Sequence, residues 1–200
     1  MQLIDIGANL THDSFDRDRD AVLARAREAG VVQMVITGAS REHSPMALEL
    51  AQQHPGILFA TAGVHPHHAL EYTDECDAEM RALHAHPEVV AVGECGLDYN
   101  RDFSPRPAQR NAFERQLQLA SENHKPLFLH QRDAHADFMA MMKNFDGRLG
   151  PAWCIALPAS ARNCSTIWTR TGTSASPAGC ATNAVARICA SWSNIFRRSG

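Results

Sequence analysis

Three short stretches of the 200-residue chain concentrate side chains that can bind a metal ion or contact phosphate. They are Gly63-Val64-His65-Pro66-His67-His68, Gly93-Glu94-Cys95-Gly96-Leu97-Asp98 and His130-Gln131-Arg132-Asp133-Ala134-His135. Carboxylate and imidazole groups together can hold a divalent cation, since oxygen ligands suit Mg²⁺ or Mn²⁺ and imidazole nitrogen accepts Mn²⁺ or Zn²⁺. Such an ion lowers the pKa of bound water and stabilises charge on a phosphoryl oxygen. The three stretches therefore indicate a site for metal-dependent hydrolysis.

Within these stretches, Glu94 and His130 are the residues that we expect to bind the metal. His65 and Arg132 are candidates for contacts with the substrate. Asp98 is either a carboxylate that orients a metal ligand or the cap at the start of a helix. Each residue also has a structural alternative, since a lone Glu can pair with a basic neighbour and a lone His can be a hydrogen-bonded core residue.

The elements that must position these side chains alternate between apolar runs and amphipathic stretches. The apolar runs predict strands over 2–6, 31–37, 57–62, 89–92 and 126–129, and helical periodicity predicts helices over 15–29, 41–54, 74–86, 105–123 and 134–144. Near-continuous apolar strands that alternate with helices indicate a parallel sheet covered by helices. Eight such units make a (β/α)8 barrel of about 250 residues, of which this chain encodes about five.

The structural rival is an open, doubly wound sheet. Such sheets often carry a glycine-rich phosphate loop, GxGxxG, after the first strand. The corresponding residues here are Asp5-Ile6-Gly7-Ala8-Asn9-Leu10, which do not fit that motif. The barrel is therefore favoured, and in a barrel the carboxyl ends of the strands converge on one mouth. The three candidate stretches follow the third, fourth and fifth strands, so we expect them to meet there.

Bulk composition is that of an ordinary globular protein, with 44% hydrophobic and 20% charged residues. No signal peptide or membrane span is evident, so we expect a cytoplasmic protein, and a monomer. The net charge of −3 does not by itself indicate a nucleic-acid partner, although a nuclease can hold phosphate through a metal ion. The six cysteines form no CxxC pair, which argues against a structural zinc site.

The last 50 residues differ sharply from the rest. All 22 acidic residues and all 11 histidines lie within 1–150, whereas 151–200 contains all three tryptophans and, among charged residues, five arginines. A basic nucleic-acid-binding tail is one explanation, but such tails usually avoid scattered Trp and Cys. The codons of Trp153 to Ala159 allow another: one additional base in front of them gives Val-Val-His-Cys-Leu-Thr-Gly, and the new frame continues with strand and helix patterning. We interpret 153–200 as an out-of-frame segment after an N-terminal barrel part, 1–152.

Four motifs together resemble the TatD family of metal-dependent deoxyribonucleases. They are Asp5-Ile6-Gly7-Ala8-Asn9-Leu10-Thr11, Thr61-Ala62-Gly63-Val64-His65-Pro66-His67, Val92-Gly93-Glu94-Cys95-Gly96-Leu97-Asp98 and His130-Gln131-Arg132-Asp133-Ala134-His135. The resemblance runs from residue 2 to about residue 152. It implies a (β/α)8 barrel of the metallo-dependent hydrolase type, with Glu94 and His130 in the positions of family metal ligands. The implied activity is that of a 3′–5′ exonuclease on single-stranded DNA and RNA, with Mg²⁺ and a role in DNA repair.

The sequence departs from the family pattern at several points. Many relatives carry a His-x-His pair after the first strand, where this chain has Gly7 and Asn9, a replacement typical of one subgroup. The resemblance implies a third histidine ligand near residue 155, where the chain has Ile155, and a later aspartate motif that is absent. We therefore expect the chain as written to be unstable or inactive. Two alternatives stay open: an amidohydrolase-like metalloenzyme acting on a small substrate, and an inactive product of a frameshifted gene.

Overall fold

The computed structural model describes residues 2–156. The segment 157–200, most of the predicted out-of-frame part, lies outside the described residues. Six strands form one parallel sheet in the order β1-β2-β3-β4-β5-β6. The strands are β1 (Leu3–Ala8), β2 (Val31–Ile36), β3 (Leu58–Ala62), β4 (Val89–Asp98), β5 (Leu127–Arg132) and β6 (Ala152–Ala156).

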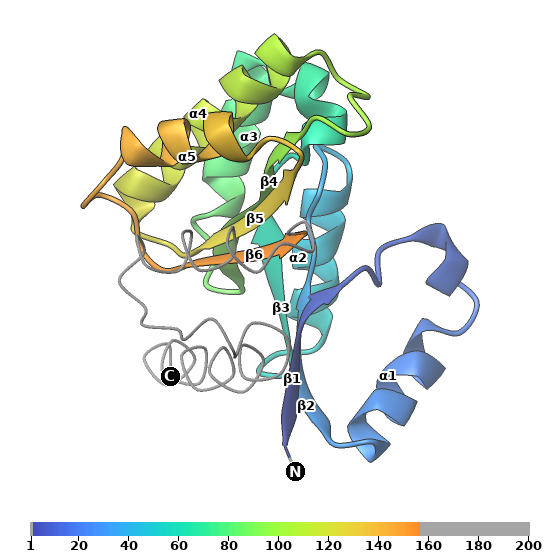
Figure 1. Cartoon of the computed structure of the whole chain (residues 1–200). Coiled ribbons are helices and arrows are strands. Elements are labelled where there is room, and N and C mark those ends of the chain that lie inside the picture. Colours follow the sequence, from blue (N-terminus) through green and yellow to red (C-terminus); the bar gives the residue numbers. More distant parts are fainter. Residues whose placement is uncertain (1, 157–200) are drawn as a thin grey trace, which may run out of the picture.

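Helices connect successive strands. They are α1 (Arg19–Glu28), α2 (His43–Gln53), α3 (Asp74–Leu83), α4 (Arg106–Asn123) and α5 (His135–Lys143), with two 3₁₀ helices, η1 (Asp13–Phe15) and η2 (Pro66–Glu71). In Figure 1, α3, α4 and α5 lie together over one face of the curved sheet. Within residues 2–156, no helix has the length and apolar character needed to cross a membrane.

The strand order distinguishes the barrel from its rival. Each strand pairs with the next one in the chain, whereas a doubly wound sheet reverses its order at a switch point. A parallel sheet that winds in one direction with helices on one face is half of a (β/α)8 barrel. The predicted fold class is therefore confirmed. The structure adds a sixth strand that the patterning did not predict, and its residues 153–156 belong to the segment interpreted as out of frame.

Two apolar layers lie on opposite faces of the sheet. The larger layer joins the strands to the helices and includes the fully buried side chains of Leu58, Phe113 and Phe138. The smaller layer contains strand residues alone: Ile6, Val35, Phe59, Val90, Ala91, Phe128 and Trp153. Because each of the six strands contributes to it, this layer corresponds to the interior of the half-barrel. Trp153 is 3% exposed there, so β6 completes the described part of the interior.

Two strands are longer than the sequence predicts. We expected the fourth strand to end at Val92 and the fifth at Leu129, but β4 continues to Asp98 and β5 to Arg132. The parallel register pairs Gly96 with His130 and Asp98 with Arg132. The candidate residues Glu94, Asp98 and His130 therefore lie within paired strands and not in the loops that follow them. Conversely, the first helix begins at Arg19 instead of residue 15, after the short η1.

Candidate metal centre

Side chains from three neighbouring strand ends converge at one point. His65 follows β3, Glu94 lies in β4 and His130 lies in β5. One potential ligand atom from each residue lies within 4.8 Å of the other two. The side chains are 10%, 12% and 11% exposed, respectively. Two imidazole rings and a carboxylate gathered in so small a buried space form a group of residue types that can hold a metal ion.

Glycines allow these strands to approach one another closely. Gly96 has φ +145°, and a Cβ atom built on it would lie 1.9 Å from the carbonyl oxygen of His130. Gly93 has φ +132°, and its Cβ would lie 2.0 Å from the carbonyl oxygen of Phe128. No side chain fits such spaces, and the backbone conformations also disfavour other residues. The two glycines that flank Glu94 and Cys95 in the sequence motif thus let β4 place its carboxylates against β5.

His130 lies between two carboxylates. Its Nδ1 is 3.1 Å from Glu94 Oε1, and its Nε2 is 3.2 Å from Asp98 Oδ2. A neutral imidazole has a single N–H, so it can donate to one of these oxygens and turns a lone pair toward the other. If Nε2–H donates to Asp98, the Nδ1 lone pair faces the Glu94 oxygen. A cation between those two acceptors relieves their repulsion, and an N–H held by a carboxylate is the usual support of a metal-bound histidine.

The hydrogen bonds of His65 differ from those of His130. His65 Nδ1 accepts from the backbone N–H of His67 at 3.1 Å, which caps η2. Its Nε2 lies 3.6 Å from Glu94 Oε1. Burial, reinforced by the neighbouring His130 and His67, lowers the pKa of His65 to about 2. The neutral ring then carries its proton on Nε2, so His65 presents an N–H to the centre of the cluster.

Asp98 lies at the centre of a second set of contacts. Its Oδ2 accepts from Nε2 of both His67, at 3.0 Å, and His130. Its Oδ1 accepts from the backbone N–H groups of Asn100 and Arg101. Burial by itself would raise the pKa of Asp98, but these hydrogen bonds outweigh it and hold the pKa at about 2. Asp98 does not cap a helix, since the helix that follows it, α4, begins at Arg106.

The remaining sequence candidates lie near the cluster without belonging to it. Arg132 is the last residue of β5, two positions after His130, and its guanidinium makes no hydrogen bond or ion pair within residues 2–156. His135 begins α5, and its Nδ1 is buried without a partner among the described residues. Ile155, at the position of the implied third histidine, belongs to β6, and its side chain lies outside the described part.

The sequence patterning missed two buried glutamines of α4, Gln109 and Gln116. Both are 1% exposed. The amide of Gln116 accepts from Val64 N–H at 2.8 Å and donates to the Val64 carbonyl oxygen, which fixes the residue before His65. Gln109 makes the equivalent pair of bonds with Asp98. Residues seven positions apart lie on the same face of a helix, so the spacing of Gln109 and Gln116 could have indicated that both face the sheet.

Comparisons with known proteins show which family the chain belongs to. Residues 4–156, more than three quarters of the chain, match the family described as TatD-related DNase. The chain belongs to the TatD-related DNase family. Among its TatD relatives, the "3′-5′ ssDNA/RNA exonuclease TatD" of Erwinia tasmaniensis is 48% identical over 164 residues, which cover 82% of this chain and 60% of the relative. The protein with the same name from Cronobacter turicensis is also 48% identical, over 82% of this chain and 59% of the relative.

Solved structures of TatD proteins share the fold. A TatD homologue from Escherichia coli superposes with a TM-score of 0.75 at 29% identity, covering 86% of this chain and 66% of that one. A hydrolase of the TatD family from Entamoeba histolytica gives a TM-score of 0.72 at 27% identity, covering 85% and 63%. The chain thus spans about 60% of the length of the curated TatD relatives.

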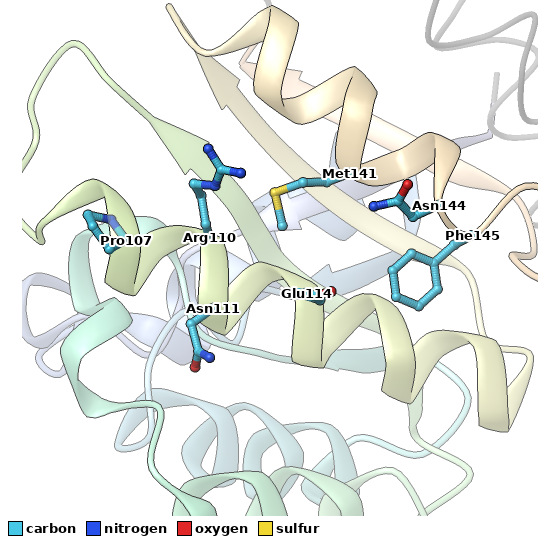
Figure 2. A pocket seen from close by; sticks show the side chains of 7 residues that line it. All are labelled: Pro107, Arg110, Asn111, Glu114, Met141, Asn144 and Phe145. Carbon is cyan, nitrogen blue, oxygen red and sulfur yellow. The ribbon is translucent and has the colours of Figure 1, made fainter.

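A separate surface pocket of about 470 Å³ lies between α4 and α5 (Figure 2). It is lined by Pro107, Arg110, Asn111, Glu114, Met141, Asn144 and Phe145. Arg110, the positively charged residue among those that line the pocket, forms an ion pair with Asp137 at 3.0 Å. None of the clustered His and Glu residues lines this pocket, which belongs to the helical layer. The residues that could hold a metal ion therefore lie away from this pocket, at the strands.

Proposed function

We propose that this chain derives from a metal-dependent nuclease that hydrolyses phosphodiester bonds, of the 3′–5′ exonuclease type, acting on single-stranded DNA and RNA. The observation that carries the proposal is the placement of His130 Nδ1 and Glu94 Oε1, 3.1 Å apart, with Asp98 behind the ring. Two relatives that are 48% identical carry names describing that activity. A part in DNA repair, a cytoplasmic location and a monomeric state remain expectations of the same proposal.

In this proposal, Glu94 and His130 hold a divalent cation, and Asp98 orients His130 through the Nε2–H. Bound there, the ion supplies an acidified water and a positive charge beside the phosphate. We take the ion to be Mg²⁺, and the imidazole donor also admits Mn²⁺ or Zn²⁺. His65 presents its Nε2–H to a phosphate oxygen, since its Nδ1 is engaged by His67 N–H. Arg132, whose guanidinium has no partner among residues 2–156, is the second phosphate contact.

We further propose that residues 153–200 result from a frameshift. Restoring one base before the codon of Trp153 would change Ile155 to the histidine that the family uses as a further ligand. Sequencing the locus tests this directly. A read that contains the additional base supports the proposal, and an unambiguous read without it means that the printed segment is the natural product.

The activity is tested on a chain with the frame restored. Purified protein is incubated with a uniformly labelled single-stranded oligonucleotide and Mg²⁺, and released mononucleotides are measured. We expect release that stops on chelation and is abolished by Glu94→Ala, because removal of one ligand carboxylate leaves the cation unheld. The matched control is Glu79→Ala. Glu79 is an exposed residue of α3 that forms an ion pair with Arg41. Unchanged release by Glu94→Ala would show that the site assignment is wrong.

An amidohydrolase-like activity on a small ester or amide is the second candidate, because this fold supports many chemistries. A panel of such substrates, assayed with and without competing single-stranded DNA, separates the two. Turnover of a small amide that DNA does not inhibit would favour the alternative.

A further inference from the structure

The most exposed large apolar side chain of the described residues is an aromatic ring beside the metal centre. Phe103 is 69% exposed. The other exposed large apolar side chains of the described part are Val32 and Met46, each 39% exposed, and Leu70, 66% exposed. An isolated exposed aliphatic residue needs no explanation, but an aromatic ring loses more by contact with water. We therefore ask what the exposed ring of Phe103 could bind.

The ring lies directly against the chain of hydrogen bonds that leads to the metal centre. Its centroid is 4.7 Å from that of His67, with an angle of 60° between the rings. His67 donates to Asp98, and Asp98 accepts from His130. The centroids of His67 and His65 are 4.2 Å apart. Phe103 is thus one ring removed from the cluster, and its solvent-exposed area lies at the edge of the site.

The loop that carries Phe103 is fixed from both sides although the ring itself is exposed. Ser104, 1% exposed, donates its hydroxyl to the carbonyl oxygen of His67 at 2.8 Å. The Gln109 amide donates to the carbonyl oxygen of Ser104, also at 2.8 Å. Asp102, on the other side of Phe103, is paired with Arg106. A ring held in place before the ligand arrives loses little conformational freedom on binding.

We propose that Phe103 is a stacking platform for a nucleobase of the single-stranded substrate, a specificity residue that rests on the nuclease function proposed above. Every base offers a flat π face, so an aromatic platform binds single strands without reading their sequence. A base paired in a duplex has both faces covered by its neighbours, so the platform favours unpaired strands. The ring binds a base next to the scissile phosphate, while His65 and the cation contact the phosphate itself.

The test compares two oligonucleotides on the 200-residue chain. Both are fluorescently labelled and phosphorothioate-linked, which slows hydrolysis, and in one the bases are replaced by abasic sites. Affinity is measured by fluorescence anisotropy in Mg²⁺ for the unmodified chain and for Phe103→Ala, Phe103→Trp and Leu70→Ala. We expect Phe103→Ala to weaken binding of the base-containing strand about 5- to 150-fold and to leave the abasic strand unchanged. Phe103→Trp should retain the affinity, because tryptophan also offers an aromatic face.

Leu70→Ala is the matched control, since Leu70 is nearly as exposed as Phe103 but aliphatic, and we expect no change with either strand. Three results would overturn the proposal: unchanged binding by Phe103→Ala, an equal loss on both strands, or no binding of the base-containing strand to the unmodified chain. Hydrolysis is assayed separately on the frame-restored protein. Base-dependent binding without hydrolysis by the frame-restored protein would support the stacking role of Phe103 and contradict the proposed nuclease activity. Hydrolysis without base-dependent binding would support the nuclease activity and contradict the stacking role.

Discussion

The side chain of Gln109 forms hydrogen bonds with both the backbone N–H and the backbone carbonyl of Asp98. Its side-chain oxygen accepts from Asp98 N–H at 2.9 Å, and its amide nitrogen donates to the Asp98 carbonyl oxygen at 3.1 Å. The same nitrogen reaches the carbonyl oxygen of Ser104. A side chain from α4 thus forms the backbone hydrogen bonds of the last residue of β4 that a neighbouring strand would otherwise form. The carboxylate behind His130 is therefore positioned by α4 as well as by the sheet.

Replacing Gln109 by Ala should destabilise the fold. The change leaves the N–H and carbonyl of Asp98 without partners in a buried place, and we expect a loss of about 2–3 kcal/mol in the free energy of unfolding. Urea denaturation followed by circular dichroism measures it. Gln118→Ala on the same helix is the control, since Gln118 bonds the surface residue Glu122, and it should cost less than about 0.5 kcal/mol. Equal losses for the two variants would mean that the hydrogen bonds between Gln109 and Asp98 add nothing to the stability of the fold.

Asp98→Asn should weaken metal binding while leaving the fold intact. The carboxylate that fixes the ring of His130 is lost, and changes of this kind typically reduce metal affinity about 10- to 100-fold. Titration calorimetry with Mn²⁺ gives the affinity directly. Asp102→Asn removes a nearby carboxylate that pairs with Arg106, and it should bind Mn²⁺ like the parent chain. If Asp98→Asn bound as tightly as Asp102→Asn, Asp98 would not orient the ligand.

Gly96→Ala should be far more damaging than Gly56→Ala. Both glycines have positive φ, which costs another residue about 1–2 kcal/mol, but a Cβ on Gly56 meets nothing within 4 Å. A Cβ on Gly96 collides with the His130 carbonyl oxygen, so we expect a total loss of about 3–5 kcal/mol. Thermal and urea unfolding of the two variants test the difference. Similar stabilities would show that β4 and β5 need not approach so closely.

Acidification should destabilise the protein through His84. This side chain donates to the carbonyl oxygen of Ala62, and burial, together with the charge of Lys125, lowers its pKa to about 4. The unfolded chain binds the proton first, at a pKa of about 6.5, so stability falls as the pH drops from about 6.5 toward 4. We expect His84 to account for a loss of about 2 kcal/mol between pH 7 and pH 5.

The comparison of His84→Gln with the parent chain isolates this effect, since the variant keeps an amide donor but does not titrate. Urea unfolding at several pH values should show a shallower dependence for the variant. The buried His65 acts in the same direction in both chains and cancels from the difference. Parallel pH dependences would exclude His84 as the source.

The 200-residue chain as written should not release nucleotides, whereas the frame-restored chain should. The sheet of the described residues has β1 and β6 as its two edges, and strands of this kind are paired in a closed barrel. Side-by-side assays with Mg²⁺ and single-stranded DNA decide the matter. Cooperative unfolding together with metal-dependent release by the chain as written would contradict the prediction.

The sequence was sufficient for the order of elements but not for the interior of the site. Apolar runs such as 31–37 predict buried parallel strands because hydrophobic burial is encoded locally. The extension of β4 past Val92 could not be predicted in this way, since Gly93 and Gly96 usually mark turns. Here they mark contact with β5, which exists only in the folded chain. The structure places the sequence candidates His65, Glu94 and His130 close together, but the position of Asp98 between two imidazoles depends on three-dimensional distances.

The pairing of each strand with its successor also bears on synthesis. The residues of the candidate centre lie just after β3, in β4 and in β5, which are consecutive strands, so their approach requires no partner encoded further downstream. Contacts between neighbours in the chain form early and at little entropic cost. A nascent polypeptide can therefore bring these side chains together while the rest of the chain is still being translated, so their arrangement does not depend on the sequence that follows β5.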